Sequence, residues 1–188
     1  MIPDSKRLFA AIDIQAGETF ADLYHNLRQI LGIHIIKWVD LSNIHITLKF
    51  FGETPEMEIP AIIEALQSSV AGIQPFELNI RQTGIFGSSY NPRVIWFGIE
   101  ANPMFLKLNK NIKTFLEEIG FISDRQNFVP HLTVGRIKEI RDKNHFQEVL
   151  SAFRDFQFQQ TLVKEFHLFE SILHRKGPEY NIIETFAF

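Results

Sequence analysis

The sequence predicts an α+β fold of two pseudo-symmetric lobes, each an antiparallel sheet with helices on its outer face, the two sheets facing a central cleft. Three observations lead to it. Strand and helix patterns follow one another along all 188 residues. One short motif, His-apolar-Thr-apolar, occurs twice, nearly half the chain apart. No linker rich in Gly, Pro and Ser separates the halves, so residues 1–188 are expected to form a single bilobal domain with one motif in each half.

In the first half of the chain, short apolar runs predict strands, and apolar residues spaced three and four apart predict helices. The strands are expected at 7–14, 35–39, 44–51 and 76–83, and the helices at 19–31 and 55–70. Thr19 is expected to cap the first helix, and Gly52 to end the motif strand. The segment 84–92 is rich in turn residues, which predicts a loop that forms a lid or rim of the cleft.

The second half continues in the same manner. A strand is expected at 94–99, a helix from Asn102-Pro103 to Gly120 and a second motif strand at 128–136. A helix at 142–153 follows, and the chain ends in strands at 161–169 and 182–188. The predicted order is therefore strand-helix-strand-strand-helix-strand-strand-helix-strand-helix-strand-strand.

Composition excludes several classes of protein. The chain has no Cys, which excludes disulfides, a thiol nucleophile and thiolate metal sites. Its net charge of −3 argues against a non-specific nucleic-acid coat, although a small cationic pocket that grips one RNA end remains compatible with it. Residues 1–9 do not resemble a signal peptide, and no apolar run approaches the ~20 residues that a membrane span needs. We expect a soluble, cytoplasmic monomer with no membrane partner.

The two motifs are His45-Ile46-Thr47-Leu48 and His131-Leu132-Thr133-Val134. In a strand, alternate side chains share a face, so each histidine lies beside its threonine while the apolar pair points into the core. A random chain of this composition would contain only about 0.06 such matches. We therefore expect both His-Thr pairs to line the same cleft.

Two histidines at one cleft can bind a metal, act as an acid and a base, or be structural. A metal is disfavoured, because neither motif face carries a third Asp, Glu or Cys ligand. Acid–base catalysis fits better, since histidine titrates near neutrality. The threonine hydroxyls can then donate hydrogen bonds to a phosphate held between the imidazoles. The motifs alone thus favour phosphodiester chemistry without a metal or other cofactor.

Further blocks of the sequence accompany the motifs. The chain resembles the two-histidine phosphoesterase superfamily and, within it, the RNA 2',3'-cyclic phosphodiesterases once described as 2'-5' RNA ligases. The resemblance spans nearly the whole chain, in order and approximate spacing. Its blocks are Arg7-Leu8-Phe9, Trp38-Val39, 43–52, 92–96, 130–136 and Phe169-Glu170-Ser171.

The resemblance implies one phosphoesterase domain that hydrolyses an RNA terminal 2',3'-cyclic phosphate to a 2'-phosphate. It implies His131 as general base, His45 as general acid, Thr47 and Thr133 as phosphate clamps, and Arg136 as an added cation. Strict alternation places Arg136 opposite to His131, so its role requires a β-bulge near Gly135. The partner would be an RNA 3' end bearing a cyclic phosphate, or a small cyclic nucleotide.

Other assignments stay open at this stage. The same acid–base pair would serve a 2'-5' RNA ligase or a phosphodiesterase of small cyclic or 2'-5'-linked nucleotides, whereas a binding module would hold RNA ends without turnover. Lys49, expected on the face of His45, is a weaker candidate for phosphate attraction, and Arg7 and Arg93 are weaker still. His25 and His34 are expected to have no chemical role, and the late histidines His167 and His174 lack a threonine partner. No base-stacking residue is assigned.

Overall fold

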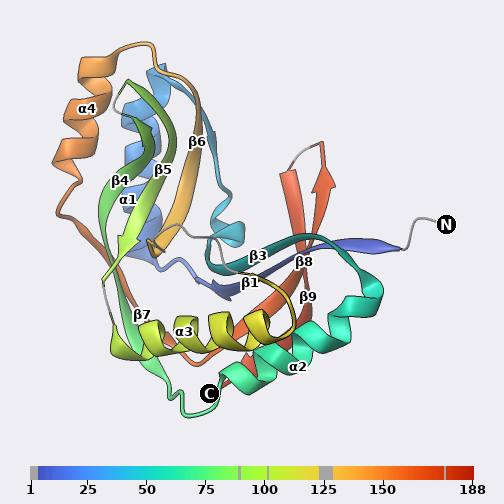
Figure 1. Cartoon of the computed structure of the whole chain (residues 1–188). Helices are drawn as coiled ribbons and strands as arrows, with labels where there is room; N and C mark the ends of the chain where they lie inside the picture. The colour runs from blue at the N-terminus through green and yellow to red at the C-terminus, as the bar shows by residue number, and fades with distance from the viewer. Residues whose placement is uncertain (1–3, 89, 101, 123–128, 176) are drawn as a thin grey trace.

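The computed structural model describes residues 4–88, 90–100, 102–122, 129–175 and 177–188 (Figure 1). In the first half the elements are β1 Ser5–Asp13, α1 Glu18–Ile30, β2 Ile35–Trp38, β3 His45–Pro55, α2 Ile59–Ser69, β4 Phe76–Ser88 and β5 Asn91–Ile99. In the second half they are α3 Pro103–Glu118, β6 His131–Glu139, α4 Lys143–Ala152, β7 Gln157–Val163, β8 Glu165–His174 and β9 Gly177–Ala187. No helix in these ranges is long and apolar enough to cross a bilayer.

The described strands form one curled antiparallel sheet in the order β7-β4-β5-β6-β3-β1-β8-β9, with β2 paired to β6. The two motif strands, β3 and β6, meet in the middle through the single residue pair Ile46 and Leu132. From this junction the two parts of the sheet diverge, with helices on their outer sides (Figure 1). The α+β class is confirmed, but where two facing sheets were expected, the two lobes share a continuous one.

Each lobe carries one motif strand, yet the lobes do not correspond to the two halves of the chain. The upper lobe of Figure 1 contains β2, β4, β5, β6 and β7 with α1 and α4, and the lower lobe contains β1, β3, β8 and β9 with α2 and α3. Thus α1 leaves the lobe of β1, because its Phe20 packs edge-on against Phe97 of β5 at 5.6 Å and Phe158 of β7 at 6.4 Å between ring centroids. Each half of the chain supplies one motif, as expected, but each lobe is built from segments of both halves.

A cluster of buried residues runs through both lobes and forms the core. Phenylalanine pairs stack within it: Phe97 lies on Phe158 at 3.8 Å between centroids, and Phe166 on Phe186 at 4.8 Å. Ile46 and Leu132 of the motifs are completely buried where the lobes join. The apolar residues of each motif therefore pack into the core on the side opposite the histidine and threonine, as the alternation predicts.

The strand predicted to end at Gly52 continues to Pro55. Gly52 has φ of 77°, a left-handed conformation that glycine adopts without strain, and the pairing with β1 shifts there from Gly52–Leu8 to Phe50–Phe9. Gly52 therefore produces a β-bulge. At the start of α1, Gly17 occupies the N-cap in place of Thr19.

The predicted loop at 84–92 is instead part of a long hairpin, since β4 extends to Ser88 and β5 begins at Asn91. A Cβ at Gly84 would lie 2.1 Å from the Trp96 ring, so this glycine makes room for an indole within the ladder. The strand predicted at 161–169 is also two strands, β7 and β8, separated at Lys164. Phe128, the predicted start of the second motif strand, lies outside the described residues.

Candidate active site

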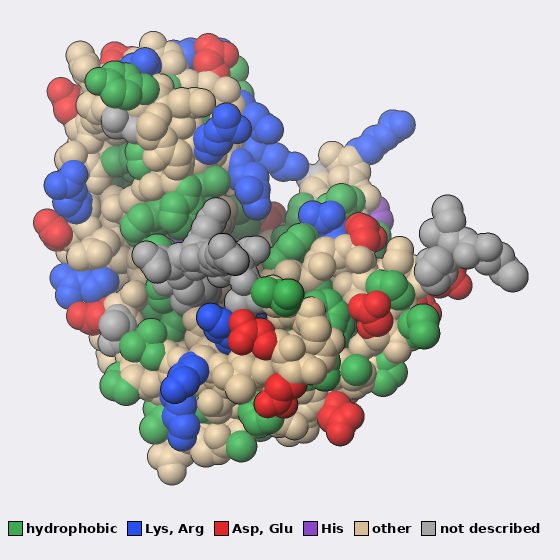
Figure 2. Space-filling view, in the orientation of Figure 1, with side chains coloured by type: hydrophobic (Ala, Val, Ile, Leu, Met, Phe, Trp, Pro, Cys, Tyr) green, Lys and Arg blue, Asp and Glu red, His purple; other side chains and the backbone are tan. Residues whose placement is uncertain are grey.

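A cleft of about 1140 Å³ opens where β3 and β6 meet. Its walls include all five residues that the sequence singled out: His45, Thr47, His131, Thr133 and Arg136. The space-filling view shows the hollow between the two lobes (Figure 2). The structure therefore brings the two His-Thr pairs, far apart in the sequence, to one site.

Both catalytic candidates are held by the same backbone contact. His45 Nδ1 lies 2.8 Å from the carbonyl oxygen of Asn43, and His131 Nδ1 lies 2.8 Å from that of Val129. A carbonyl oxygen can only accept, so Nδ1 carries the proton in each ring and donates it. Nε2 is then the nitrogen that accepts a proton in the neutral ring and donates one in the charged ring. Either histidine is thus equipped as acid or base.

The ring of His45 lies within an aromatic enclosure. Its centroid is 4.9 Å from that of Phe9 in β1 and 5.3 Å from that of Tyr180 in β9. Burial is the main cause that lowers the pKa of His45, and the positive charges of His131 and Arg136 lower it further. The Asn43 carbonyl and the Asp13 carboxylate act in the opposite direction without cancelling this effect.

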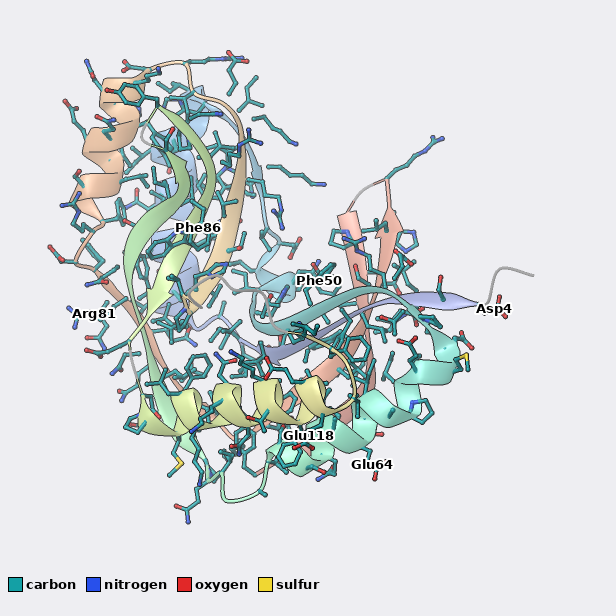
Figure 3. All side chains as sticks on the ribbon, viewed as in Figure 1. Asp4, Phe50, Glu64, Arg81, Phe86 and Glu118 are labelled. Carbon is teal, nitrogen blue, oxygen red and sulfur yellow. The ribbon has the colours of Figure 1, made fainter. Side chains whose placement is uncertain are left out.

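The surroundings of His131 are different. Among the residues that the structure describes, the aromatic ring in contact with it is Phe86 of β4, which lies edge-on with centroids 4.6 Å apart and is in turn 5.6 Å from Trp96. Phe86 of β4 and Phe50 of β3 are aromatic residues of different lobes (Figure 3). Phe86 and Tyr180 were not predicted at the site because segment 84–92 was expected to be a loop and Tyr180 lies in the predicted connector between the last two strands, and Phe9 was not predicted because aromatic residues in strands are usually core.

A β-bulge brings Arg136 to the cleft, as its predicted role requires. Thr133 pairs with Trp96 of β5, and the next pair joins Gly135 to Ile95, so Val134 is the extra residue. The bulge reverses the alternation, and Arg136 returns to the face of Thr133. The hydroxyls of Thr47 and Thr133 have no hydrogen-bond partner among the described residues, and both face the cleft.

A second bulge, at Leu48, lies at the equivalent place in β3, because Thr47 pairs with Ala11 and Lys49 with Ala10. The expectation that Lys49 shares the face of His45 was therefore wrong: its Nζ donates to the carbonyl oxygen of Ile122, 3.2 Å away. Phe50 lines the cleft instead, with the Arg7 guanidinium 4.9 Å above its ring. Of the weaker candidates, Arg7 lines the cleft and Arg93 does not.

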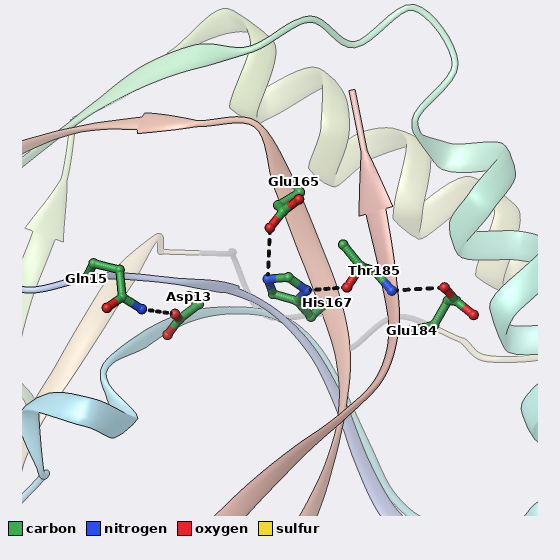
Figure 4. A network of polar contacts seen from close by, with 6 residues as sticks. All are labelled: Asp13, Gln15, Glu165, His167, Glu184 and Thr185. Atoms are coloured by element: carbon green, nitrogen blue, oxygen red, sulfur yellow. Dashed lines mark hydrogen bonds and ion pairs between the residues drawn. The ribbon is translucent and has the colours of Figure 1, made fainter.

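Histidines outside the motifs have structural partners. His34, for which no chemical role was expected, lies 3.2 Å from His145 and accepts a hydrogen bond from the backbone of Arg141. His167 lies 2.9 Å from the hydroxyl of Thr185 and 3.7 Å from Glu165 (Figure 4). In the same view Gln15 donates to Asp13, the residue paired with His45. Within the part of the chain that the structure describes, no three His, Asp or Glu side chains come together as a metal site would require.

Two curated relatives match nearly the whole chain in sequence. One from Methanothermobacter thermautotrophicus, named RNA 2',3'-cyclic phosphodiesterase, is 32% identical over 182 residues, which cover 96% of this chain and 97% of the relative. A relative of the same name from Methanocaldococcus jannaschii is 34% identical and covers 95% of this chain and 98% of its own.

Among solved structures, TT0787 of Thermus thermophilus is 30% identical with a TM-score of 0.78, covering 96% of this chain and 97% of its own. E. coli LigT complexed with 3'-AMP shares the fold, with a TM-score of 0.79 at 24% identity over 98% of this chain and 99% of its own. A family model described as the 2'-5' RNA ligase superfamily matches residues 16–174. The protein, with its paired His-x-Thr strands at one cleft, belongs to the 2'-5' RNA ligase superfamily.

Proposed function

We propose that this protein hydrolyses the 2',3'-cyclic phosphodiester at an RNA end to a 2'-phosphomonoester, without a metal, through His45 and His131. The observation that carries the proposal is the matched pair of imidazoles, each with Nδ1 at 2.8 Å from a backbone carbonyl oxygen. They share one cleft with two threonine hydroxyls that have no hydrogen-bond partner among the described residues. The curated relatives at 32% and 34% identity that are named RNA 2',3'-cyclic phosphodiesterase support it.

In the proposed reaction, His131 Nε2 takes a proton from water while the water oxygen attacks phosphorus. The bond from phosphorus to the 3'-oxygen breaks, and His45, protonated at Nε2, gives its proton to that oxygen. The products are a 2'-phosphate and a 3'-hydroxyl. The water oxygen forms the new bond to phosphorus, His131 holds the proton taken from water, and the proton of the new hydroxyl comes from His45. A second proton exchange with solvent restores the starting states.

Thr47, Thr133 and Arg136 would bind the phosphate during this step. Each threonine lies two residues after its histidine on the same face, so the two hydroxyls can donate to the non-bridging oxygens from opposite sides. The guanidinium of Arg136 adds positive charge where negative charge accumulates in the transition state. In this proposal each motif supplies one imidazole for proton transfer and one hydroxyl for the phosphate.

The assignment of His45 as acid has to be reconciled with its lowered pKa. In the free cleft, burial and nearby positive charges favour the neutral ring. The bound phosphate brings a negative charge to the same cleft, which favours the protonated imidazole and raises its pKa. The acid role is therefore compatible with the bound state, and the pH dependence of the reaction tests it.

The test is turnover of a short RNA ending in a 2',3'-cyclic phosphate, in excess chelator, by the wild type, His45→Ala and His131→Ala. We expect a 2'-phosphate product from the wild type and a loss of at least ~100-fold in kcat for each variant, the usual size of a general acid or base contribution. His25→Ala is the matched control, since His25 is an exposed histidine outside the cleft; it should retain wild-type turnover.

Each contrary outcome identifies a different error. Loss of turnover on chelation would refute the metal-free mechanism. Retained binding of the RNA without turnover would favour a binding module, and joining of RNA ends through a 2'-5' bond as the main reaction would favour a ligase. A 3'-phosphate product would show that the 2'-oxygen leaves.

A further inference from the structure

The cleft has a strong local charge that the chain as a whole lacks. Among the described residues that line it, Arg7, Arg28, Lys37, Arg136 and Arg175 are cationic, whereas Asp40 and Glu179 are the acidic ones. The net charge of the whole chain is −3. Positive charge is thus concentrated at this cleft, which attracts an anionic ligand there and not over the general surface.

Arg28, Lys37 and Arg175, which we call the outer cations, belong to a different part of the cleft from the motif residues. Arg28 is on α1 and Lys37 on β2, both in the upper lobe, whereas Arg175 follows β8 at the tip of the β8–β9 hairpin. The space-filling view shows Lys and Arg side chains on the side of the upper lobe that faces this hairpin, and again at its tip (Figure 2). The outer cations therefore flank the cleft from both lobes.

The outer cations form no ion pair among the described residues, although the charge of Arg28 helps to lower the pKa of the Asp40 carboxyl. All three are exposed, and none forms an ion pair or a side-chain hydrogen bond with the residues that the structure describes. The two acidic residues nearby have closer partners: Asp40 accepts hydrogen bonds from the backbone and hydroxyl of Ser42, which affect its carboxylate more than Arg28 does, and Glu179 lies 3.0 Å from His174. The charge of the outer cations is consequently available to a ligand.

The cleft is also larger than a terminal nucleotide needs. Sites for drug-sized ligands occupy about 300–1,000 Å³, and this cleft reaches about 1140 Å³. If the cyclic phosphate binds between the histidines, the outer cations lie along the remaining space. The neighbouring nucleotides of an RNA strand carry one phosphate each. Exposed Lys and Arg side chains bind such backbone phosphates.

We propose that the outer cations bind the backbone phosphates of the RNA strand that leads to the terminal cyclic phosphate, so that this protein prefers an oligonucleotide end over a mononucleoside cyclic phosphate. This inference rests on the proposed function and adds a second binding region to it. The strand runs from the motif histidines through the cleft, between the α1–β2 side of the upper lobe and the β8–β9 hairpin. The contacts are to the backbone, so they select length and not sequence.

The experiment compares kcat/KM for two substrates, a nucleoside 2',3'-cyclic phosphate and a ten-nucleotide RNA that ends in the same cyclic nucleotide. The proteins are the wild type and the triple variant Arg28→Gln, Lys37→Gln, Arg175→Gln. We expect the wild type to prefer the RNA, and the variant to lose about tenfold in the ratio of the two kcat/KM values. The slope of log KM for the RNA against log salt concentration should also decrease by about 2, because each of the three lost phosphate contacts contributes about 0.7 to this slope.

The matched control removes three exposed lysines that do not line the cleft, through Lys110→Gln, Lys113→Gln and Lys164→Gln. This change of net charge is the same, and the RNA preference should remain. Equal kcat/KM for both substrates in the wild type, or proportional losses on both in the outer-cation variant, would overturn the inference while leaving the proposed function intact. A wild type that hydrolyses neither substrate would instead refute the proposed function.

Discussion

The two motif strands have the same backbone arrangement in different surroundings. In both, a histidine donates from Nδ1 to the carbonyl two residues earlier, a threonine follows, and a β-bulge comes directly after it. In β3 the bulge brings Phe50 to the cleft, and in β6 the equivalent position is Arg136. His45 is enclosed by Phe9 and Tyr180, whereas among the described residues only the ring of Phe86 contacts that of His131.

The comparison separates what orients the histidines from what distinguishes them. The shared carbonyl contact fixes the same tautomer in both rings and cannot assign one as acid and the other as base. The aromatic enclosure of His45 and the presence of Arg136 on only one of the two motif strands break the symmetry, and burial and Arg136 both lower the pKa of His45. We therefore expect the roles of the two histidines to be set by these neighbours.

The largest expected effect concerns the histidines as a pair. If the two act in one proton-transfer step, the double variant His45→Ala, His131→Ala should lose about as much kcat as the poorer single variant, on the order of 10³-fold. Single-turnover rates of the wild type, both single variants and the double variant test this. A double variant whose loss equals the product of the two single losses would show that the histidines act independently.

Substitutions at the two equivalent positions after the bulges, Arg136 and Phe50, should lower kcat/KM to different extents. Arg136→Gln removes a charge beside the phosphate and should lower kcat/KM by about 10- to 100-fold, the size of a lost charge-assisted hydrogen bond. Phe50→Ala removes no charge and should cost less than about threefold by the same reasoning. Steady-state kinetics on a nucleoside 2',3'-cyclic phosphate, which does not reach the outer cations, distinguishes them. Equal losses at both positions would show that the asymmetry between the strands does not concern charge.

The sequence was sufficient to predict those parts of the site that depend on local periodicity. The i, i+2 spacing placed His45 beside Thr47 and His131 beside Thr133, and the buried Ile46 and Leu132 confirm the alternation. A bulge was required for Arg136, and it is present at Val134. The equivalent bulge at Leu48 had no such signal, because Lys49 fits simple alternation equally well, and its predicted orientation was wrong.

What the sequence could not predict depends on contacts between distant segments. Phe9 and Tyr180 are 171 residues apart in the chain, by their numbers, and their rings lie 4.9 Å apart across β1 and β9. Nothing in either segment distinguishes them from core aromatics. The packing of α1 on the lobe that does not contain β1 was unpredictable for the same reason. An amphipathic helix pattern shows that one face is buried but not which strands cover it.

The smallest effect in magnitude tests the acid and base roles directly. Tyr180→Ala opens the enclosure of His45, reduces its burial and therefore raises its pKa toward the ordinary value. The limb of the profile of kcat/KM against pH that belongs to His45 should move to higher pH, with little change at the optimum. Phe86→Ala is the matched change beside His131 and should leave that limb in place.

The limb that moves identifies the role of His45. A general acid must be protonated, so its pKa governs the fall of kcat/KM at high pH, and in Tyr180→Ala that fall should begin at a higher pH than in the wild type. A general base must be neutral, and its pKa governs the rise at low pH, which would then move up instead. The proposed acid role predicts movement of the high-pH limb. Movement of the low-pH limb would exchange the roles of His45 and His131, and an unchanged profile would show that Tyr180 does not control the protonation of His45.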